Sequence, residues 1–65
     1  MIIDTKKYNL LLANNSMSVK ELSELSGVAE VTLCRIRSGV QVARPQTLGK
    51  IAKALNCKVE DFIND

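Results

Sequence analysis

The sequence predicts a small all-α fold, and three observations lead to this prediction. The chain has 65 residues, enough for one compact core and no more. Apolar residues recur at helical spacing, and no alternating run is long enough for a convincing strand. Hydrophobic residues make up 46% of the chain and charged residues 25%, a balance typical of globular domains rather than disordered chains. We therefore expect residues 1–65 to form a single domain.

The first helix is expected to begin after Asp4, a good N-cap, and to end at about Asn14. Tyr8, Leu11 and Leu12 are spaced so that they face a core. The polar residues 14–16 end this helix.

The second helix carries the strongest local signal in the chain. Ser18 and Glu21 form a Ser-x-x-Glu capping box, in which each side chain satisfies an unpaired amide at the helix start. Leu22 and Leu25 supply its apolar face, and Gly27 stands where a left-handed cap would end it. We therefore expect a helix of only two turns.

A third helix follows after a turn of about four residues. It is expected over residues 30–38, with Leu33 and Ile36 on one face and Gly39 at its end. Two short helices joined by a tight glycine-containing turn form a helix-turn-helix unit, here at about residues 18–38.

A fourth helix and a last turn complete the prediction of five helices. Pro45 suits a first helical position, because its fixed φ helps and its missing amide hydrogen costs nothing there. Apolar residues then follow at i, i+3, i+4 and i+7: Leu48, Ile51, Ala52 and Leu55. A final turn around residues 59–63, with Glu60 and Asp61 in its first turn, is expected to close the core with Phe62.

Positive charge is concentrated in one part of the chain. The net charge is only +2, but residues 35–53 hold five cations and no acid: Arg35, Arg37, Arg44, Lys50 and Lys53. Such a stretch is typical of a surface that binds a polyanion, although charge alone also fits a solvated face.

Absent residues exclude several functions. The chain has no His and no Trp, and Cys34 and Cys57 are too far apart for a zinc site, so we expect neither an enzyme nor a metal. No cofactor or small-molecule ligand is implied.

The longest apolar run, Leu10–Ala13, has four residues where a membrane helix needs about twenty. Without a signal-peptide pattern, we expect a cytoplasmic protein with free thiols.

Residues 18–63 resemble the phage-repressor and Cro type of helix-turn-helix domain, also called the Xre-like family. The matching segments, in order, are Ser18–Leu22, Gly27–Val28, Val31–Gly39, Arg44–Pro45, Leu48–Leu55 and Val59–Ile63. The resemblance implies a compact five-helix, lambda-repressor-like DNA-binding domain. Most members of the family are sequence-specific transcriptional regulators, and many are dimers.

The chain departs from the family pattern at three places. Val19 stands where a Gln commonly contacts phosphate and braces the third helix. Leu12 and Arg37 replace an Arg–Glu pair that many members have, and this change leaves Arg37 free to approach phosphate. Ala29 replaces the usual Ser or Thr cap of the third helix.

Position match to the family gives the base-contacting candidates, which are Glu30, Val31 and, one turn onward, Arg35. Arg35 suits guanine, while its alternative is a surface pair with Glu30 or Glu24. Glu30 could accept a hydrogen bond from cytosine N4 or simply stabilise the helix N-terminus. Val31 could pack on a thymine methyl group or fill space beside the second helix.

Seven further residues are candidates for contacts to the DNA backbone, which position a domain without reading sequence. The candidates are Ser18, Thr32, Arg37, Ser38, Arg44, Gln46 and Thr47. Gln46 and Thr47 would act through their backbone amides, because a helix N-terminus offers unpaired amide hydrogens to an anion. Cys34 lies near this surface, and we expect both Cys34 and Cys57 to be unreactive.

The resemblance implies a sequence-specific DNA-binding transcriptional regulator, expected to be a repressor that places helix 30–38 in the major groove of double-stranded DNA. A homodimer on a near-palindromic operator is expected, and the turn around Phe62 is a candidate interface. The alternative is a protein-interaction module on the same fold, such as an antitoxin-like or antirepressor subunit.

Overall fold

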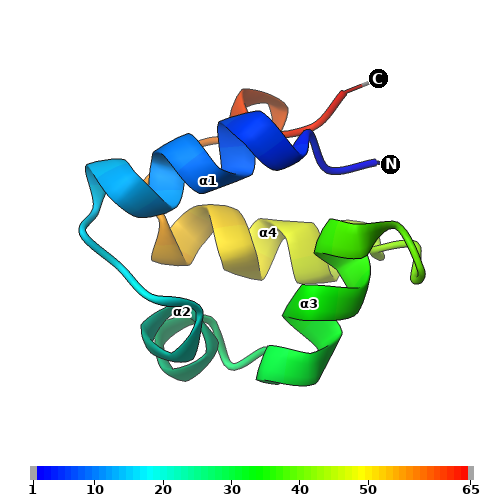
Figure 1. Ribbon diagram of the computed structural model, residues 1–65, viewed down its shortest axis with the longest axis horizontal. Coiled ribbons are helices and arrows are strands. Elements are labelled where there is room, and N and C mark those ends of the chain that lie inside the picture. The colour runs from blue at the N-terminus through cyan, green and yellow to red at the C-terminus, as the bar shows by residue number, and fades with distance from the viewer. Residues whose placement is uncertain (1, 65) are drawn as a thin grey trace.

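A computed structural model describes residues 2–64 of the chain, which form four α-helices and one short 3-10 helix. The elements, in chain order, are α1 (Thr5–Asn14), α2 (Val19–Ser26), α3 (Glu30–Ser38), α4 (Pro45–Ala54) and η1 (Val59–Asp61). Figure 1 shows α4 running through the middle, with α1 on one side and α2 and α3 on the other. This arrangement confirms the predicted all-α fold.

The helix ends follow the capping signals of the sequence. The Asp4 side chain accepts a hydrogen bond from the Lys7 amide at 3.2 Å. Ser18 and Glu21 form both bonds of the predicted capping box, at 3.1 and 3.2 Å. Gly27 ends α2 in the left-handed conformation, with φ of 76°, which costs other residues energy because of their Cβ.

The last predicted helix is a single 3-10 turn. The Lys58 amide donates to the Asp61 carboxylate at 3.0 Å, which closes the turn. Phe62 follows at once and is fully buried, so the chain turns into the core before an α-helix can form. The candidate interface at this turn stays a prediction: the Phe62 side chain packs inside the domain, so a partner would contact exposed neighbours such as Glu60 and Asp61.

The hydrophobic core lies where α4 meets the other elements. Its most deeply buried side chains are at most 2% exposed and come from every helix of the described chain and from the C-terminal turn: Tyr8, Leu22, Leu33, Leu48, Ile51, Leu55 and Phe62. These residues include the four-residue stripe predicted for α4, apart from Ala52, which is 5% exposed. The core therefore fixes the position of α2 relative to α4, and α3 is held in place by its packing against α2.

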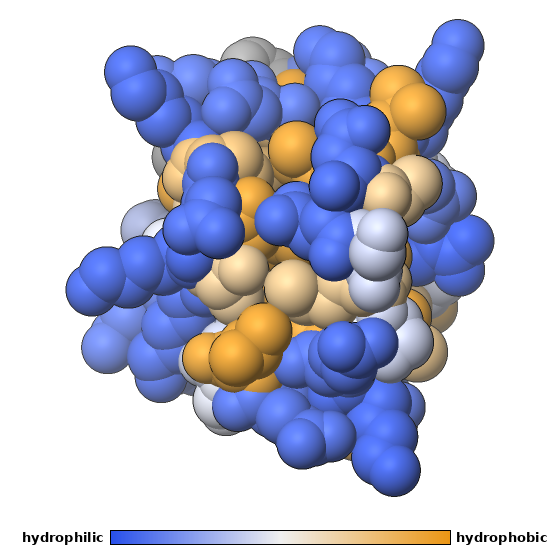
Figure 2. All heavy atoms as spheres, turned by 90° about the vertical axis from the view of Figure 1, so that its left-hand side faces the viewer, coloured by the Kyte–Doolittle hydropathy of each residue, from blue (hydrophilic) through white to orange (hydrophobic). Residues whose placement is uncertain are grey.

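One predicted core residue is on the surface. Leu25 is 65% exposed, whereas Leu22 is fully buried. Leu25 lies about 60° around the helix axis from Leu22. Because α2 has only two turns and Leu25 is near its end, the Leu25 side chain lies outside the contact between α2 and α4. Figure 2, which views the side where α1 leads into α2, shows apolar surface gathered between hydrophilic side chains.

Two segments from opposite ends of the chain are joined by backbone hydrogen bonds. Ile3 and Ile63 form an isolated antiparallel bridge. On either side of it, the Asp4 amide donates to the Phe62 carbonyl at 2.8 Å and the Asn64 amide to the Ile2 carbonyl at 2.9 Å. A single bridge has no periodic pattern in the sequence, and none was predicted. No helix among residues 2–64 has the length and apolar character needed to cross a membrane.

Tyr8 presents the one buried side-chain polar atom that lacks a hydrogen-bond partner in the described chain, its hydroxyl oxygen. The side chain is 1% exposed, and burial raises the pKa of the phenol. A buried hydroxyl without a partner has lost its bonds to water and gained none.

We predict that Tyr8→Phe leaves the free energy of unfolding unchanged or raises it by up to about 1 kcal/mol, because the ring stays and the unpaired hydroxyl is removed. Urea unfolding measures this change. Tyr8→Ala is the control and should lower the stability by about 3–5 kcal/mol, which for a domain of this size means unfolding. A loss of 1 kcal/mol or more in Tyr8→Phe would show that the hydroxyl is bonded in solution.

Candidate nucleic-acid interface

The turn between α2 and α3 is set by a few local contacts. The Gly27 amide donates to the Ser23 carbonyl at 2.9 Å, and the Val28 amide donates to the Ser26 hydroxyl at 3.2 Å. Val28 is 7% exposed and anchors the turn in the core. The α3 helix then begins at Glu30, so α2 and α3 are held as one helix-turn-helix unit.

The α3 helix divides sharply into an inner and an outer side. Leu33 and Ile36 face the core at 1% and 5% exposure. The three candidates for base contact, Glu30, Val31 and Arg35, are all exposed. At 55% exposure, Val31 is largely outside the packing beside α2. The structure therefore gathers the predicted base-contacting residues on one accessible helix surface.

The start of α3 lacks a side-chain cap. Ala29 is the N-cap residue, with φ of −58° and ψ of 144°, and no side chain satisfies the first amides of the helix. A residue with a hydroxyl could bond to one of these amides in the same backbone conformation. The N-terminal amides of α3 are therefore unpaired at the end of the helix that carries Glu30 and Val31.

The residues that replace the family's ion pair do not contact each other through charge. Leu12 is half-buried and packs against the core, while Arg37 is exposed. The Thr5 hydroxyl donates to the Arg37 carbonyl at 3.4 Å. Burial raises the pKa of Tyr8, and the nearby charge of Arg37 partly opposes this rise. The Arg37 charge therefore lies near α1 at the surface and not inside the core.

Val19 also has a packing role. It is half-buried and packs against the hydrophobic core from the first turn of α2. A Val cannot donate a hydrogen bond to phosphate. At this position the chain has apolar packing instead of a polar side chain.

The backbone-contact candidates fall into two groups. The Ser18 and Ser38 hydroxyls are engaged within the protein: Ser18 pairs with Glu21 and Ser38 donates to the Arg35 carbonyl at 3.1 Å. Arg37 and Arg44 are exposed, and Thr32 is half-buried on α3. The engaged hydroxyls keep acceptor capacity but have less freedom to donate.

The N-terminus of α4 offers donors for an anion. Arg44 is its N-cap and makes no side-chain capping bond, and Pro45 has no amide hydrogen. The Gln46 and Thr47 amides lie in the first turn, where an α-helix provides no acceptor. Arg44 therefore places a positive charge next to two unpaired amides.

All five cations of the acid-free segment lie on the surface. Arg35 and Arg37 belong to α3, Arg44 precedes α4, and Lys50 and Lys53 lie on the outer side of α4. In the loop between α3 and α4, Val40 and Val42 are 78% and 75% exposed, and neither was predicted as a site residue. Their only signal in the sequence is that they are apolar residues outside any helical spacing.

Residues 2–64 contain no group of three or more side chains that could hold a metal ion. What they present is an exposed helix on a helix-turn-helix support, with cations around it. This arrangement defines a helix-turn-helix domain.

Comparison with known proteins identifies the family. The model of the Cro/C1-type helix-turn-helix DNA-binding domain matches residues 9–65. The chain is 38% identical over 56 residues to an uncharacterized HTH-type transcriptional regulator, YozG, of Bacillus subtilis (strain 168), a match that covers 85% of this chain and 67% of that protein. No solved structure matches the chain. The chain belongs to the Cro/C1-type helix-turn-helix family of DNA-binding domains, as its resemblance to that family implied. Membership in a DNA-binding family also supports the expectation that it is not an enzyme.

We predict that Ala29→Ser raises the free energy of unfolding by about 1 kcal/mol, because the new hydroxyl caps an amide in the first turn of α3. Urea unfolding monitored by circular dichroism measures the gain. Ser18→Ala serves as the matched loss, since it removes the hydroxyl that caps α2 and should lower stability by a similar amount. Equal stability of Ala29→Ser and the parent would mean that the α3 amides already have partners in solution.

Proposed function

We propose that this chain is a sequence-specific transcriptional repressor that inserts α3 into the major groove of double-stranded DNA. The observation that supports this proposal most directly is the outer surface of α3, where three side chains that can contact bases stand exposed on a helix-turn-helix support. The HTH-type regulator to which the chain is similar supports the regulatory part. The expected cytoplasmic location belongs to the same proposal, because the protein must reach the DNA that it regulates.

Base readout is assigned to Glu30, Val31 and Arg35. The Arg35 guanidinium can donate two hydrogen bonds to guanine O6 and N7, and Val31 can contact a thymine methyl group. Glu30 can accept a hydrogen bond from cytosine N4, which compensates for placing a carboxylate near phosphates. Such pairs each contribute about 1–3 kcal/mol of discrimination between bases.

Backbone contacts are assigned to the surroundings of α3. Arg44 with the Gln46 and Thr47 amides forms the most favourable phosphate site, since a charge and two unpaired donors lie together. Arg37 and Thr32 on α3 supply further donors. The Ser18 and Ser38 hydroxyls complete the proposed set, with the weaker capacity that their internal hydrogen bonds leave.

A homodimer on a near-palindromic operator is part of the proposal. The described domain measures 25 × 21 × 18 Å, whereas half-sites one helical turn apart lie about 34 Å from each other. One domain therefore spans one half-site, and two copies are needed to read two. A dimer bound over a promoter would exclude the transcription machinery, which is why we favour repression.

The alternative, a protein-interaction module such as an antitoxin-like or antirepressor subunit, is favoured by the loop between α3 and α4. Val40 and Val42 are more exposed there than any other large apolar side chain of the described chain. Exposed apolar residues are common at protein interfaces.

Selection from a randomised duplex library separates the two functions. We predict a motif of two related half-sites whose centres lie about 10–10.5 base pairs apart, bound at least about a thousandfold more tightly than random duplex. Anisotropy titration at several salt concentrations measures this ratio. If no motif is enriched and the affinity for any duplex is lost near physiological salt, the interaction-module function replaces the regulator.

Substitution of Arg44 and Arg35 separates positioning from readout. Arg44→Ala should weaken binding to all duplexes and lower the slope of log affinity against log salt by about one unit. Arg35→Ala should also relax the base preference at one position of each half-site. The control is Lys6→Ala, which removes the same charge from the exposed surface of α1. An unchanged preferred site for Arg35→Ala would show that Arg35 reads no base.

A further inference from the structure

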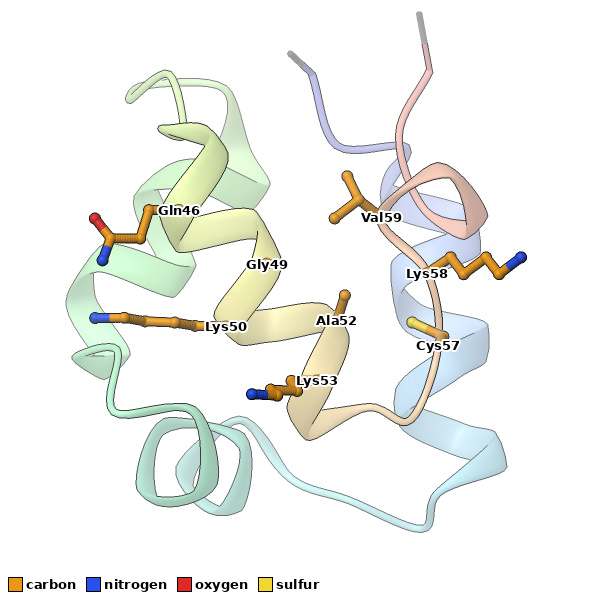
Figure 3. A pocket seen from close by; sticks show the side chains of 8 residues that line it. All are labelled: Gln46, Gly49, Lys50, Ala52, Lys53, Cys57, Lys58 and Val59. Atoms are coloured by element: carbon orange, nitrogen blue, oxygen red, sulfur yellow. The ribbon is translucent and has the colours of Figure 1, made fainter.

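The structure holds a groove that shares one residue, Gln46, with the proposed DNA contacts. It lies between α4 and the segment that leads into η1, has a volume of about 600 Å³, and opens to solvent (Figure 3). It is lined by Gln46, Gly49, Lys50, Ala52, Lys53, Cys57, Lys58 and Val59. No described residue of α3 belongs to this lining, and among the proposed phosphate contacts only Gln46, at the N-terminal end of α4, does.

The groove combines an apolar floor with a basic rim. Ala52 is buried at the floor, and Cys57 and Val59 are half-buried on the opposite side. Figure 3 shows Lys50 and Lys53 extending from α4 on the side away from Cys57 and Val59, and Lys58 pointing away from the groove. None of the described residues that line it is acidic. The neighbouring Asp61 carboxylate accepts a hydrogen bond from its own turn, at the Lys58 amide.

Gly49 keeps this groove open. It lies in the interior of α4, where Gly costs about 1 kcal/mol relative to Ala. A Cβ built at Gly49 would meet no atom within 4 Å, so close packing does not require the glycine. Its φ is not in the left-handed region either. Because Gly49 belongs to the lining, a side chain at this position would extend into the groove.

We propose that this groove binds an acidic, amphipathic helical segment of a partner protein. A helix that carries carboxylates and apolar side chains three and four residues apart presents both on one face. The apolar side chains would contact Ala52 and Val59, while the carboxylates would pair with Lys50 and Lys53. A segment of about ten residues matches α4 in length, since α4 has ten residues.

The chemistry of the groove disfavours other occupants. A duplex or a membrane surface would meet the lysines but could not fill a concave apolar floor. A second copy related by a two-fold axis would bring Lys50 and Lys53 toward the same residues of its mate, with no acid in the lining to compensate. An acidic partner satisfies both the charge and the apolar surface.

The test is selection from a displayed library of random 14-residue peptides against the folded protein without DNA. We expect enrichment of peptides with acidic and apolar residues at helical spacing that bind one to one. Gly49→Leu should weaken their binding at least about tenfold, because its side chain enters the groove, and Lys50→Glu with Lys53→Glu should do the same by reversing the charge. Lys6→Glu with Lys7→Glu, on α1, makes the same change in net charge and should alter the affinity less than about twofold.

Each variant is first checked for folding by urea unfolding, and Gly49→Leu should be at least as stable as the parent because it removes a helix-interior glycine. The proposal is overturned if no acidic peptide is enriched, or if the two lysine pairs have equal effects. It is also overturned if Gly49→Leu weakens duplex binding as much as Arg44→Ala does, or if it abolishes a homodimer. The same holds if the protein binds phosphatidylserine vesicles more tightly than the selected peptides and Gly49→Leu removes that vesicle binding. Because no DNA is present, failure here leaves the DNA-binding proposal standing.

Discussion

The packing of the apolar side of α4 against the remaining elements is the interaction on which the structure depends. Leu48, Ile51 and Leu55 are at most 2% exposed, and α4 contacts both α2 and η1. No helix of the described chain exceeds ten residues, and helices of this length are marginal in water by themselves. The direction in which α3 presents its outer surface is therefore set by burial and shape, since no charged side chain among residues 2–64 is buried.

Most of the fold could be predicted because its helix ends have local chemical causes. The Ser18–Glu21 capping box, the left-handed Gly27 and the Pro45 start each act within a few residues, and each is present. Leu25 was wrongly expected in the core. Hydrophobic periodicity shows on which side of a helix a residue lies, but it does not show how wide the packing surface of the neighbouring helix is. The pairing of Ile3 with Ile63 could not be read from any local pattern, because it joins residues from opposite ends of the chain.

The site was predictable in position and less so in detail. Exposure of Glu30 and Arg35 follows from the placement of Leu33 and Ile36 on the opposite side of the same helix. Whether a hydroxyl is free depends on three-dimensional contacts, and no local pattern indicates that the Ser38 hydroxyl donates to a carbonyl of its own helix. The groove beside Gly49 was likewise hidden, because a glycine within a helical pattern looks the same whether a neighbour or solvent lies beside it.

The hydrogen bonds around Ile3 and Ile63 have a consequence for how the domain is joined to other polypeptide. They hold the two ends of the described chain side by side, away from α2 (Figure 1). Because the two ends are adjacent, a domain of this kind could be inserted into a single surface loop of another protein. A mechanical force applied to both ends would break these few hydrogen bonds one after another. It would separate α1 from the C-terminal turn before it acted on the helix-turn-helix unit.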